Sequence, residues 1–126
     1  MAQWFAAHIV LVQRFIDDAP QEEFGVYENI CLVTASTVEE AWTKAEAIGQ
    51  GRETTGSSGD EKWCGRRTKW SFAGVRKVIR CGTISTRTDG PPGDGEEVSY
   101  SQLTLSSEDD LIRLVKGESV TVRYDE

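Results

Sequence analysis

The sequence predicts an α+β domain with a mainly antiparallel sheet and two helices on one face of it. Three observations predict this class: several segments alternate apolar and polar residues as strands do, two segments show helical spacing behind capping residues, and connections between strands are short. The expected order is β-β-α-β-β-β-α-β, with residues 1–126 forming one domain. Without the first strand, and with the third merged into the next, a ferredoxin-like β-α-β-β-α-β core remains.

The composition of the chain limits the classes of protein to which it can belong. The chain of 126 residues has a net charge of −7 and 38% hydrophobic residues, which is typical of a soluble globular domain. No apolar run approaches the roughly 18 residues of a membrane helix, and the start of the chain lacks a secretory signal pattern, so no membrane association is expected. Three cysteines without a CxxC pair predict no disulfide framework and indicate a reducing cytoplasm.

The first two predicted strands form a hairpin. Residues 4–16 carry apolar side chains on both faces, which predicts an interior strand or an edge strand covered by a partner. Residues 26–35 form the second strand after a short, polar connection. A turn around residues 17–25 would place each residue of the first strand opposite a residue of the second strand such that the two residue numbers sum to about 41. His8 would then lie opposite Val33.

The two predicted helices have clear boundaries. Thr37 caps the first helix, Glu40 occupies the position that completes a capping box, and apolar residues follow at helical spacing. Ser106 or Ser107 caps the second helix, acidic residues occupy its first turn, and Gly117 ends it.

The rest of the chain is expected to contain three further strands, one ambiguous segment and two loops. Alternation predicts three further strands, over residues 75–84, 97–105 and 120–124. Residues 62–71 combine tryptophans with a turn signal and are ambiguous. Two polar, glycine-rich segments, at about 49–61 and 88–96, are predicted to be mobile loops. Gly74 lies inside an apolar run and is expected to mark a bulge or a close backbone approach.

One segment concentrates positive charge. The basic segment, residues 62–87, holds eight of the chain's 14 basic residues and no acidic residue. The other six basic residues lie outside it, together with all 21 acidic residues. Cations interleaved with aromatic side chains suit single-stranded nucleic acid or a phosphorylated ligand. The candidate binding residues are Arg66, Arg67, Lys69, Trp70, Arg76, Lys77 and Arg80.

The same segment has two other interpretations. A charge-polarised surface suits a protein partner, because complementary charge steers association. Alternatively, the cations pair within the protein, since neighbouring strands offer acidic partners. These are Glu28, Glu97 and Glu118. Strand alternation places Arg76 and Arg80 on one face and Lys77 on the other, which would split the binding surface.

Candidate catalytic residues are few. His8 is the only histidine and lies mid-strand among apolar residues, which indicates a structural role. A general base needs a partner in hydrogen-bond reach, and the expected hairpin opposes no carboxylate to His8. Cys64 precedes a Gly-Arg-Arg sequence whose cations favour a reactive thiolate. No catalytic set, metal site or cofactor is predicted, because the cysteines stand singly and no glycine-rich segment lies between a strand and a helix.

The order of several motifs resembles a known family. They are Trp4-Phe5-Ala6-Ala7, Glu28-Asn29-Ile30, residues 36–45 with a Glu-Glu-Ala helix start, Trp70-x-Phe72-x-Gly74-Val75-Arg76-Lys77, Tyr100-Ser101, the Ser-Glu-Asp-Asp-Leu helix start, and Gly117-Glu118 followed by Val120-Thr121-Val122-Arg123-Tyr124. Together they span nearly the whole chain and resemble the small bacterial proteins grouped as domain of unknown function 4288. The two predicted loops match least. The resemblance implies the α+β architecture, and it brings no activity, cofactor or catalytic residue.

From these observations we expect a cytoplasmic, non-enzymatic module that binds a protein partner or forms a homodimer through an exposed sheet face or edge. The charge polarity and the two-faced first strand favour this function. The alternatives are a binder of nucleic acid or of a phosphorylated ligand through the basic segment, and an enzyme that uses His8 or Cys64.

Overall fold

The chain folds into the predicted succession of strands and helices. The computed structural model describes residues 2–17, 20–53, 62–81 and 91–126. Its elements are β1 (Gln3–Phe15), β2 (Gly25–Ala35), α1 (Val38–Gly51), β3 (Lys62–Trp63), β4 (Arg66–Arg80), β5 (Leu103–Thr104), α2 (Glu108–Lys116) and β6 (Arg123–Tyr124). The α+β class and the order β-β-α-β-β-β-α-β are therefore confirmed.

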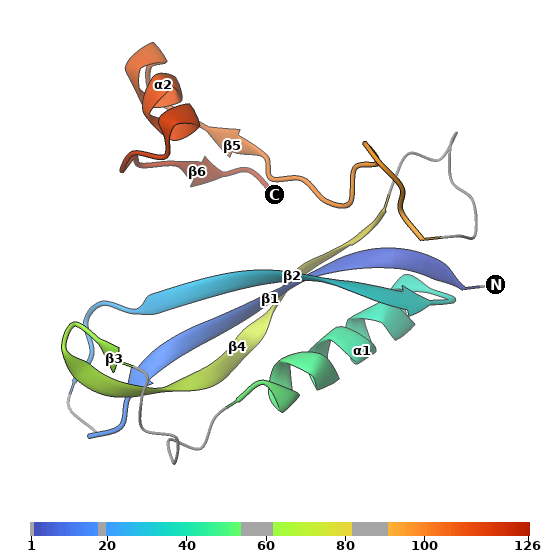
Figure 1. Cartoon of the computed structure of the whole chain (residues 1–126), viewed down its shortest axis with the longest axis horizontal. Coiled ribbons are helices and arrows are strands. Elements are labelled where there is room, and N and C mark those ends of the chain that lie inside the picture. Colours follow the sequence, from blue (N-terminus) through green and yellow to red (C-terminus); the bar gives the residue numbers. More distant parts are fainter. Residues whose placement is uncertain (1, 18–19, 54–61, 82–90) are drawn as a thin grey trace.

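Four strands form one antiparallel sheet in the order β2-β1-β4-β3 (Figure 1). β1 and β2 form the expected hairpin, and β1 has a neighbour on each side, as its two apolar faces predict. Helix α1 lies along one face of this sheet. We call the opposite face the open face; it carries Ala6 and His8 of β1 and, directly across from them, Leu32 and Ile30 of β2.

β4 is longer and less regular than predicted. The strand expected over residues 75–84 begins at Arg66, because the preceding aromatic-rich residues also pair with β1. Its register with β1 slips at two points, which leaves Ala73 and Arg76 as extra residues. Gly74 lies between the slips with a φ of 155°, a conformation that favours glycine. The predicted bulge is therefore confirmed.

The hydrophobic core lies between α1 and the sheet. Ala41 and Ala45 of α1 are fully buried there, as is Ile9 of β1. Small side chains on the helix let it approach the sheet closely, and Trp70 and Phe72 of β4 pack around the same cluster. The covered face therefore supplies most of the apolar burial that stabilises the fold.

Both helices begin at predicted caps. The Thr37 hydroxyl accepts a hydrogen bond from the Glu40 N–H at 3.1 Å, and the Ser107 hydroxyl caps α2 in the same way. The Glu40 carboxylate accepts from the Ser36 N–H at 3.2 Å, which closes the capping box one residue earlier than expected. No helix in the described part of the chain has the length and apolar character needed to cross a membrane.

The predicted mobile loops are described only in part. Residues 54–61 and 88–90 lie outside the described residues, as do residues 82–84 of a predicted strand. α1 continues to Gly51, so the first residues of the expected loop are helical. Residues 91–96 have neither helix nor strand.

Of the two helices among the described residues, only α1 lies on the four-stranded sheet, which corrects the prediction of two helices on one face. The strands expected over residues 97–105 and 120–124 shorten to β5 and β6, which pair with each other and do not extend the sheet. The ferredoxin-like core is therefore not formed among the described residues, and α2 has no extensive contact with β1, β2 or β4. We call residues 103–126 the C-terminal unit; it lies on the opposite side of the sheet from α1 (Figure 1).

Gly49→Ala should lower the free energy of unfolding by about 1–3 kcal/mol, because overpacking a formed core forces side chains out of position. A Cβ at this position would overlap the Phe72 ring, which is held in the core cluster. Urea unfolding measures the change.

Gly51→Ala is the matched control. It lies in the last turn of α1 with open space around it, so the substitution should leave stability unchanged or raise it by up to about 1 kcal/mol. Equal losses in the two variants would contradict the close approach of α1 to β4.

Candidate functional site

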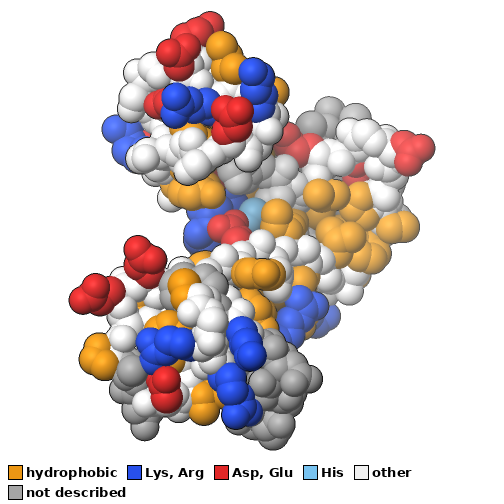
Figure 2. All heavy atoms as spheres, turned by 60° about the vertical axis from the view of Figure 1, so that its left-hand side comes forward, with side chains coloured by type: hydrophobic (Ala, Val, Ile, Leu, Met, Phe, Trp, Pro, Cys, Tyr) orange, Lys and Arg blue, Asp and Glu red, His pale blue; other side chains and the backbone are white. Residues whose placement is uncertain are grey.

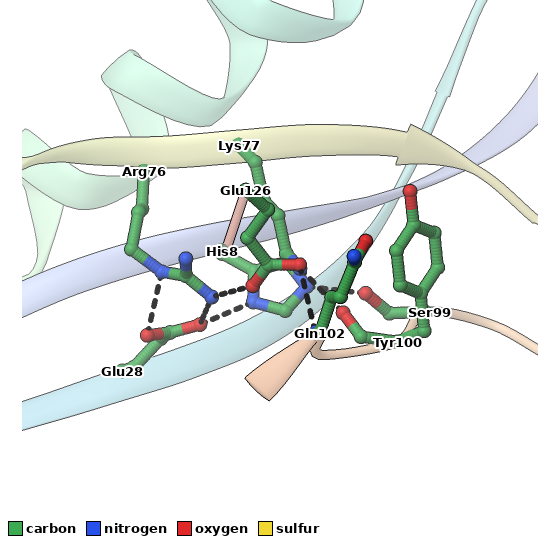
Figure 3. A network of polar contacts seen from close by, with 8 residues as sticks. All are labelled: His8, Glu28, Arg76, Lys77, Ser99, Tyr100, Gln102 and Glu126. Atoms are coloured by element: carbon green, nitrogen blue, oxygen red, sulfur yellow. Dashed lines mark hydrogen bonds and ion pairs between the residues drawn. The ribbon is translucent and has the colours of Figure 1, made fainter. Parts of the chain in front are cut away.

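A network of polar side chains occupies the centre of the open face. It joins β1, β2 and β4 to the chain that follows the sheet (Figure 3). We call it the polar network, and its members are His8, Glu28, Arg76, Lys77, Ser99 and Glu126. Only 1% of the surface of His8 is exposed, so its ring nitrogens need partners within the protein.

Glu28 is the partner of the His8 Nδ1 atom, at 2.5 Å. The hairpin register places His8 opposite Ile30, so the expected pairing with Val33 is wrong. Glu28 is the diagonal neighbour of His8 on the same face of the sheet, close enough for a long side chain to reach across. The expectation that this hairpin forms no histidine–acid pair is wrong for the same reason.

The bulge in β4 brings two cations to the network. His8 lies opposite Lys77, and Arg76 is the extra residue beside it. A bulge interrupts strand alternation, so Arg76 and Lys77 both reach the carboxylate of Glu126 on the open face. The prediction that these two cations point to opposite faces is therefore wrong.

Arg76 binds Glu28 with two parallel hydrogen bonds, from Nε at 2.9 Å and from Nη2 at 2.8 Å. This paired geometry lowers the pKa of Glu28 below its ordinary value, against the opposing effect of partial burial. The same contact raises the pKa of Arg76. Glu28 is therefore ionised at neutral pH, and His8 donates its Nδ1 proton to it.

Glu126 ties the C-terminal unit to the sheet. Its carboxylate lies 3.0 Å from Nη2 of Arg76 and 2.7 Å from Nζ of Lys77, and it accepts from the Gln102 N–H at 3.1 Å. The hydrogen bond from Lys77 is the main cause that lowers the pKa of Glu126 to about 2. Lys77 also donates to the Tyr100 carbonyl. One cation therefore binds both the segment before β5 and Glu126, which follows β6.

Ser99, His8 and Glu28 are connected in the order of a catalytic triad. The Ser99 hydroxyl is hydrogen-bonded to Nε2 of His8, whose Nδ1 is bound to Glu28. A neutral His8 in this tautomer accepts the hydroxyl proton, as a general base does when it activates serine. One feature opposes this chemistry: Arg76 already neutralises the carboxylate that would stabilise a protonated His8.

The candidate binding residues of the basic segment do not form one surface. Arg66 lies at the start of β4, 2.5 Å from the Asp17 carboxylate and with its guanidinium 3.5 Å from the centre of the Phe15 ring. It is ten residues from Arg76, or about 30 Å along a strand. Each of Arg66, Arg76 and Lys77 forms an ion pair within the protein. Of the three acidic partners that the sequence suggested for these cations, Glu28 forms such a pair, with Arg76.

The other candidates have different surroundings. Arg67, Lys69 and Arg80 are exposed along β4. Trp70 packs on the covered face, where its ring meets that of Tyr27 edge-on at 4.8 Å between centroids. Trp70 is therefore a core residue here, and it does not lie beside Arg76 and Lys77 on the open face.

Cys64 is exposed in the turn between β3 and β4, with a φ of 54°. It lines a hollow with Phe15, Pro20, Glu22, Glu23 and Arg66. Arg66, the cation expected to activate the thiol, is engaged by Asp17. Within the described residues, no group of three or more His, Cys, Asp or Glu side chains is arranged to hold a metal ion.

Two members of the network had no signal in the sequence. Ser99 is 91 residues from His8, and Glu126 lies far along the chain from Arg76 and Lys77. Neither residue belongs to a motif, and neither lies in a regular element that would direct its side chain. Only the path of the chain back over the open face brings them to β1 and β4.

Glu126→Gln should remove an acid-sensitive share of the stability. Because the folded pKa is about 2 against an ordinary 4.5, ionised Glu126 stabilises the folded state fully above 4.5 and loses this effect as the pH falls toward about 2. The difference in urea midpoint between wild type and Glu126→Gln should therefore be greatest at neutral pH and vanish near the lower value.

Glu118→Gln serves as the control, since Glu118 is an exposed carboxylate of the same C-terminal unit outside the polar network. Its urea midpoint should follow that of the wild type at every pH. A wild-type minus Glu126→Gln difference that stays constant on acidification would contradict the assigned ion pairs.

Comparison with known proteins identifies the family of the chain. The sequence profile described as Domain of unknown function (DUF4288) matches residues 4–91, which include β1, β2, α1, β3 and β4 and therefore the four-stranded sheet. No curated protein and no solved structure matches the chain. The match confirms the family resemblance over residues 4–91, and the motifs from Tyr100 onward lie outside it. The chain belongs to the DUF4288 family.

Proposed function

We propose that this chain is a non-enzymatic protein-interaction module that presents helix α2 to a protein partner. One observation carries the proposal: the apolar residues of α2 are exposed. They are Leu111 at 45%, Ile112 at 47%, Leu114 at 38% and Val115 at 80%. Apolar residues at helical spacing that remain open to solvent are typical of a helix that docks in a groove of another protein.

The polar network supports this role because it positions the C-terminal unit without using these side chains. Glu126 binds Arg76 and Lys77, and the aromatic rings of Tyr100 and Tyr124 lie against the same cations at 4.9 and 4.7 Å. Attachment by charges leaves the apolar residues of α2 for a partner. A helix held in place before binding also loses less conformational entropy when it docks.

Binding of nucleic acid or of a phosphorylated ligand has weaker support. Arg66, Arg76 and Lys77 are each ion-paired with a carboxylate of the same chain. An anionic ligand would have to displace those carboxylates, and the cations lie at two separated places on β4.

Capture of host proteins by the tagged chain tests the proposal. Leu111→Glu with Val115→Glu should reduce recovery of a stoichiometric partner at least about tenfold, because charge in the apolar centre of an interface is costly. Both side chains are exposed, so the fold should persist by circular dichroism.

Arg113→Glu is the matched control, because it lies on the same helix and changes the net charge by the same two units. It should keep the partner. Loss of the partner in both variants, or in neither, would contradict docking through the apolar face of α2.

A second candidate function, acyl transfer by Ser99, rests on its connection through His8 to Glu28. A fluorophosphonate probe labels a serine that a general base activates. We expect no labelling above that of Ser99→Ala, because Arg76 holds the Glu28 carboxylate. Labelling that requires Ser99 and His8 would establish a hydrolase-type site and overturn the non-enzymatic proposal.

A further inference from the structure

β2 is an edge strand whose outer side is open. It ends the order β2-β1-β4-β3. Its 11 residues span about 36 Å at the usual rise of a strand. In the described part of the chain, no backbone hydrogen bond joins β2 to a strand or loop other than β1. Half of its N–H and C=O groups therefore point to no other strand, and among them the Thr34 carbonyl accepts from Lys44 Nζ.

The pairing of β1 shows which groups of β2 point outward. The Trp4 carbonyl accepts from the Cys81 N–H at 3.0 Å, just past the end of β4, so even-numbered residues of β1 direct their backbone groups to the β4 side. Odd-numbered residues of β1 pair with odd-numbered residues of β2. The even-numbered residues of β2 consequently point outward, and the hydrogen bond from Lys44 Nζ to the Thr34 carbonyl, at 2.6 Å, agrees with this.

The same even-numbered residues place their side chains on the open face. Val26, Ile30 and Leu32 are exposed by 53%, 54% and 48%. Hydrophobic side chains gather beside His8 in the space-filling view (Figure 2). Glu28 is the one charged residue of β2, and Arg76 and His8 already bind it. The outer side of β2 is therefore apolar and lacks a free charge.

β4 pairs with β3 at Arg66 and Arg67, and the rest of its outer edge is guarded. Natural proteins protect sheet edges with bulges, cations and side chains that occupy free amides. β4 has two bulges, and the Phe72 N–H donates to the Glu53 carboxylate at 3.0 Å. It also carries Lys69, Arg76, Lys77 and Arg80. β2 has no bulge in its pairing with β1 and contains no proline, lysine or arginine. Lys44 of α1 reaches its outer side only at the Thr34 carbonyl, near the end of the strand.

From these observations we infer that β2 pairs with β2 of a second copy of this chain, antiparallel across a two-fold axis. Two four-stranded sheets then form one continuous sheet whose outer edges are the guarded ones, so the assembly closes as a dimer. With the axis at Ile30, Glu28 lies opposite Leu32 and no like charges meet. β2 offers no unpaired charge to which an oppositely charged partner could bind. Its apolar outer side therefore suits the equally apolar outer side of a second copy.

This inference is independent of the α2 contact proposed above, and sedimentation of the full chain tests it. Wild type should sediment as two copies of 14.0 kDa. Ile30→Lys and Ile30→Glu should each raise the dissociation constant at least about tenfold, because the axis sets like charges opposite each other. An equimolar mixture of the two variants should form dimers again, since Lys then faces Glu. Val115→Lys, on α2, should stay dimeric.

Amide hydrogen exchange gives a second readout. The N–H groups of Val26, Glu28, Ile30 and Leu32 should be protected in wild type and exposed in Ile30→Lys, while the odd-numbered amides of β2 stay protected in both. The inference is overturned if wild type is monomeric, if Ile30→Lys remains dimeric, if the mixed variants stay monomeric, or if Val115→Lys dissociates the dimer. A monomeric wild type that still loses its protein partner through α2 substitutions would leave the proposed function intact.

Discussion

The ion pair between Glu28 and Arg76 is the contact on which the open face depends. It reaches from β2 to β4 across the central strand, and its carboxylate also orients the buried His8. The same guanidinium binds Glu126, so the pair is continuous with the attachment of the C-terminal unit. Partly buried charges persist only where each finds a partner, because an unpaired one retains its desolvation cost. The network meets this condition because each of its charged groups has at least two partners.

The two faces of the sheet carry different kinds of side chains and make different contacts. On the covered face, small residues of α1 pack on β1 and β4, and apolar burial stabilises the fold. On the open face, charged residues hold the segment that returns over the sheet, and apolar residues of β2 stay exposed. The packed core and the surfaces proposed for recognition therefore lie on opposite faces of the sheet. A substitution on β2 or α2 is expected to change the proposed contacts while the core keeps its packing.

Local backbone irregularity decides which side chains meet. Gly74 adopts a conformation that is unfavourable for other residues, and the bulges beside it shift the register of β4. Without the extra residue, strand alternation would send Arg76 and Lys77 to opposite faces. The bulge thus assembles the cationic half of the network and, at the same time, makes the part of the β4 edge beyond β3 unsuitable for pairing with a further strand.

Local patterns in the amino-acid sequence predicted the succession of elements and the caps of both helices. They also offered an interior position for β1 and a bulge at Gly74, each as one of two alternatives. These features follow from local spacing, capping and backbone preference, which act over a few residues. The sequence suggested Glu28 as an acidic partner but paired His8 with the wrong residue, because a small error in the hairpin register changes every cross-strand neighbour.

The other features depend on contacts between segments that are distant in the sequence. Ser99 and Glu126 come to the open face by the path of the chain, over separations at which no local pattern acts. α2 shows the same limit: its cap and apolar spacing specify a helix, but not whether its apolar face packs on the sheet or stays exposed. That choice depends on β5 and β6 pairing with each other and leaving the sheet unextended, a long-range competition between alternative strand pairings.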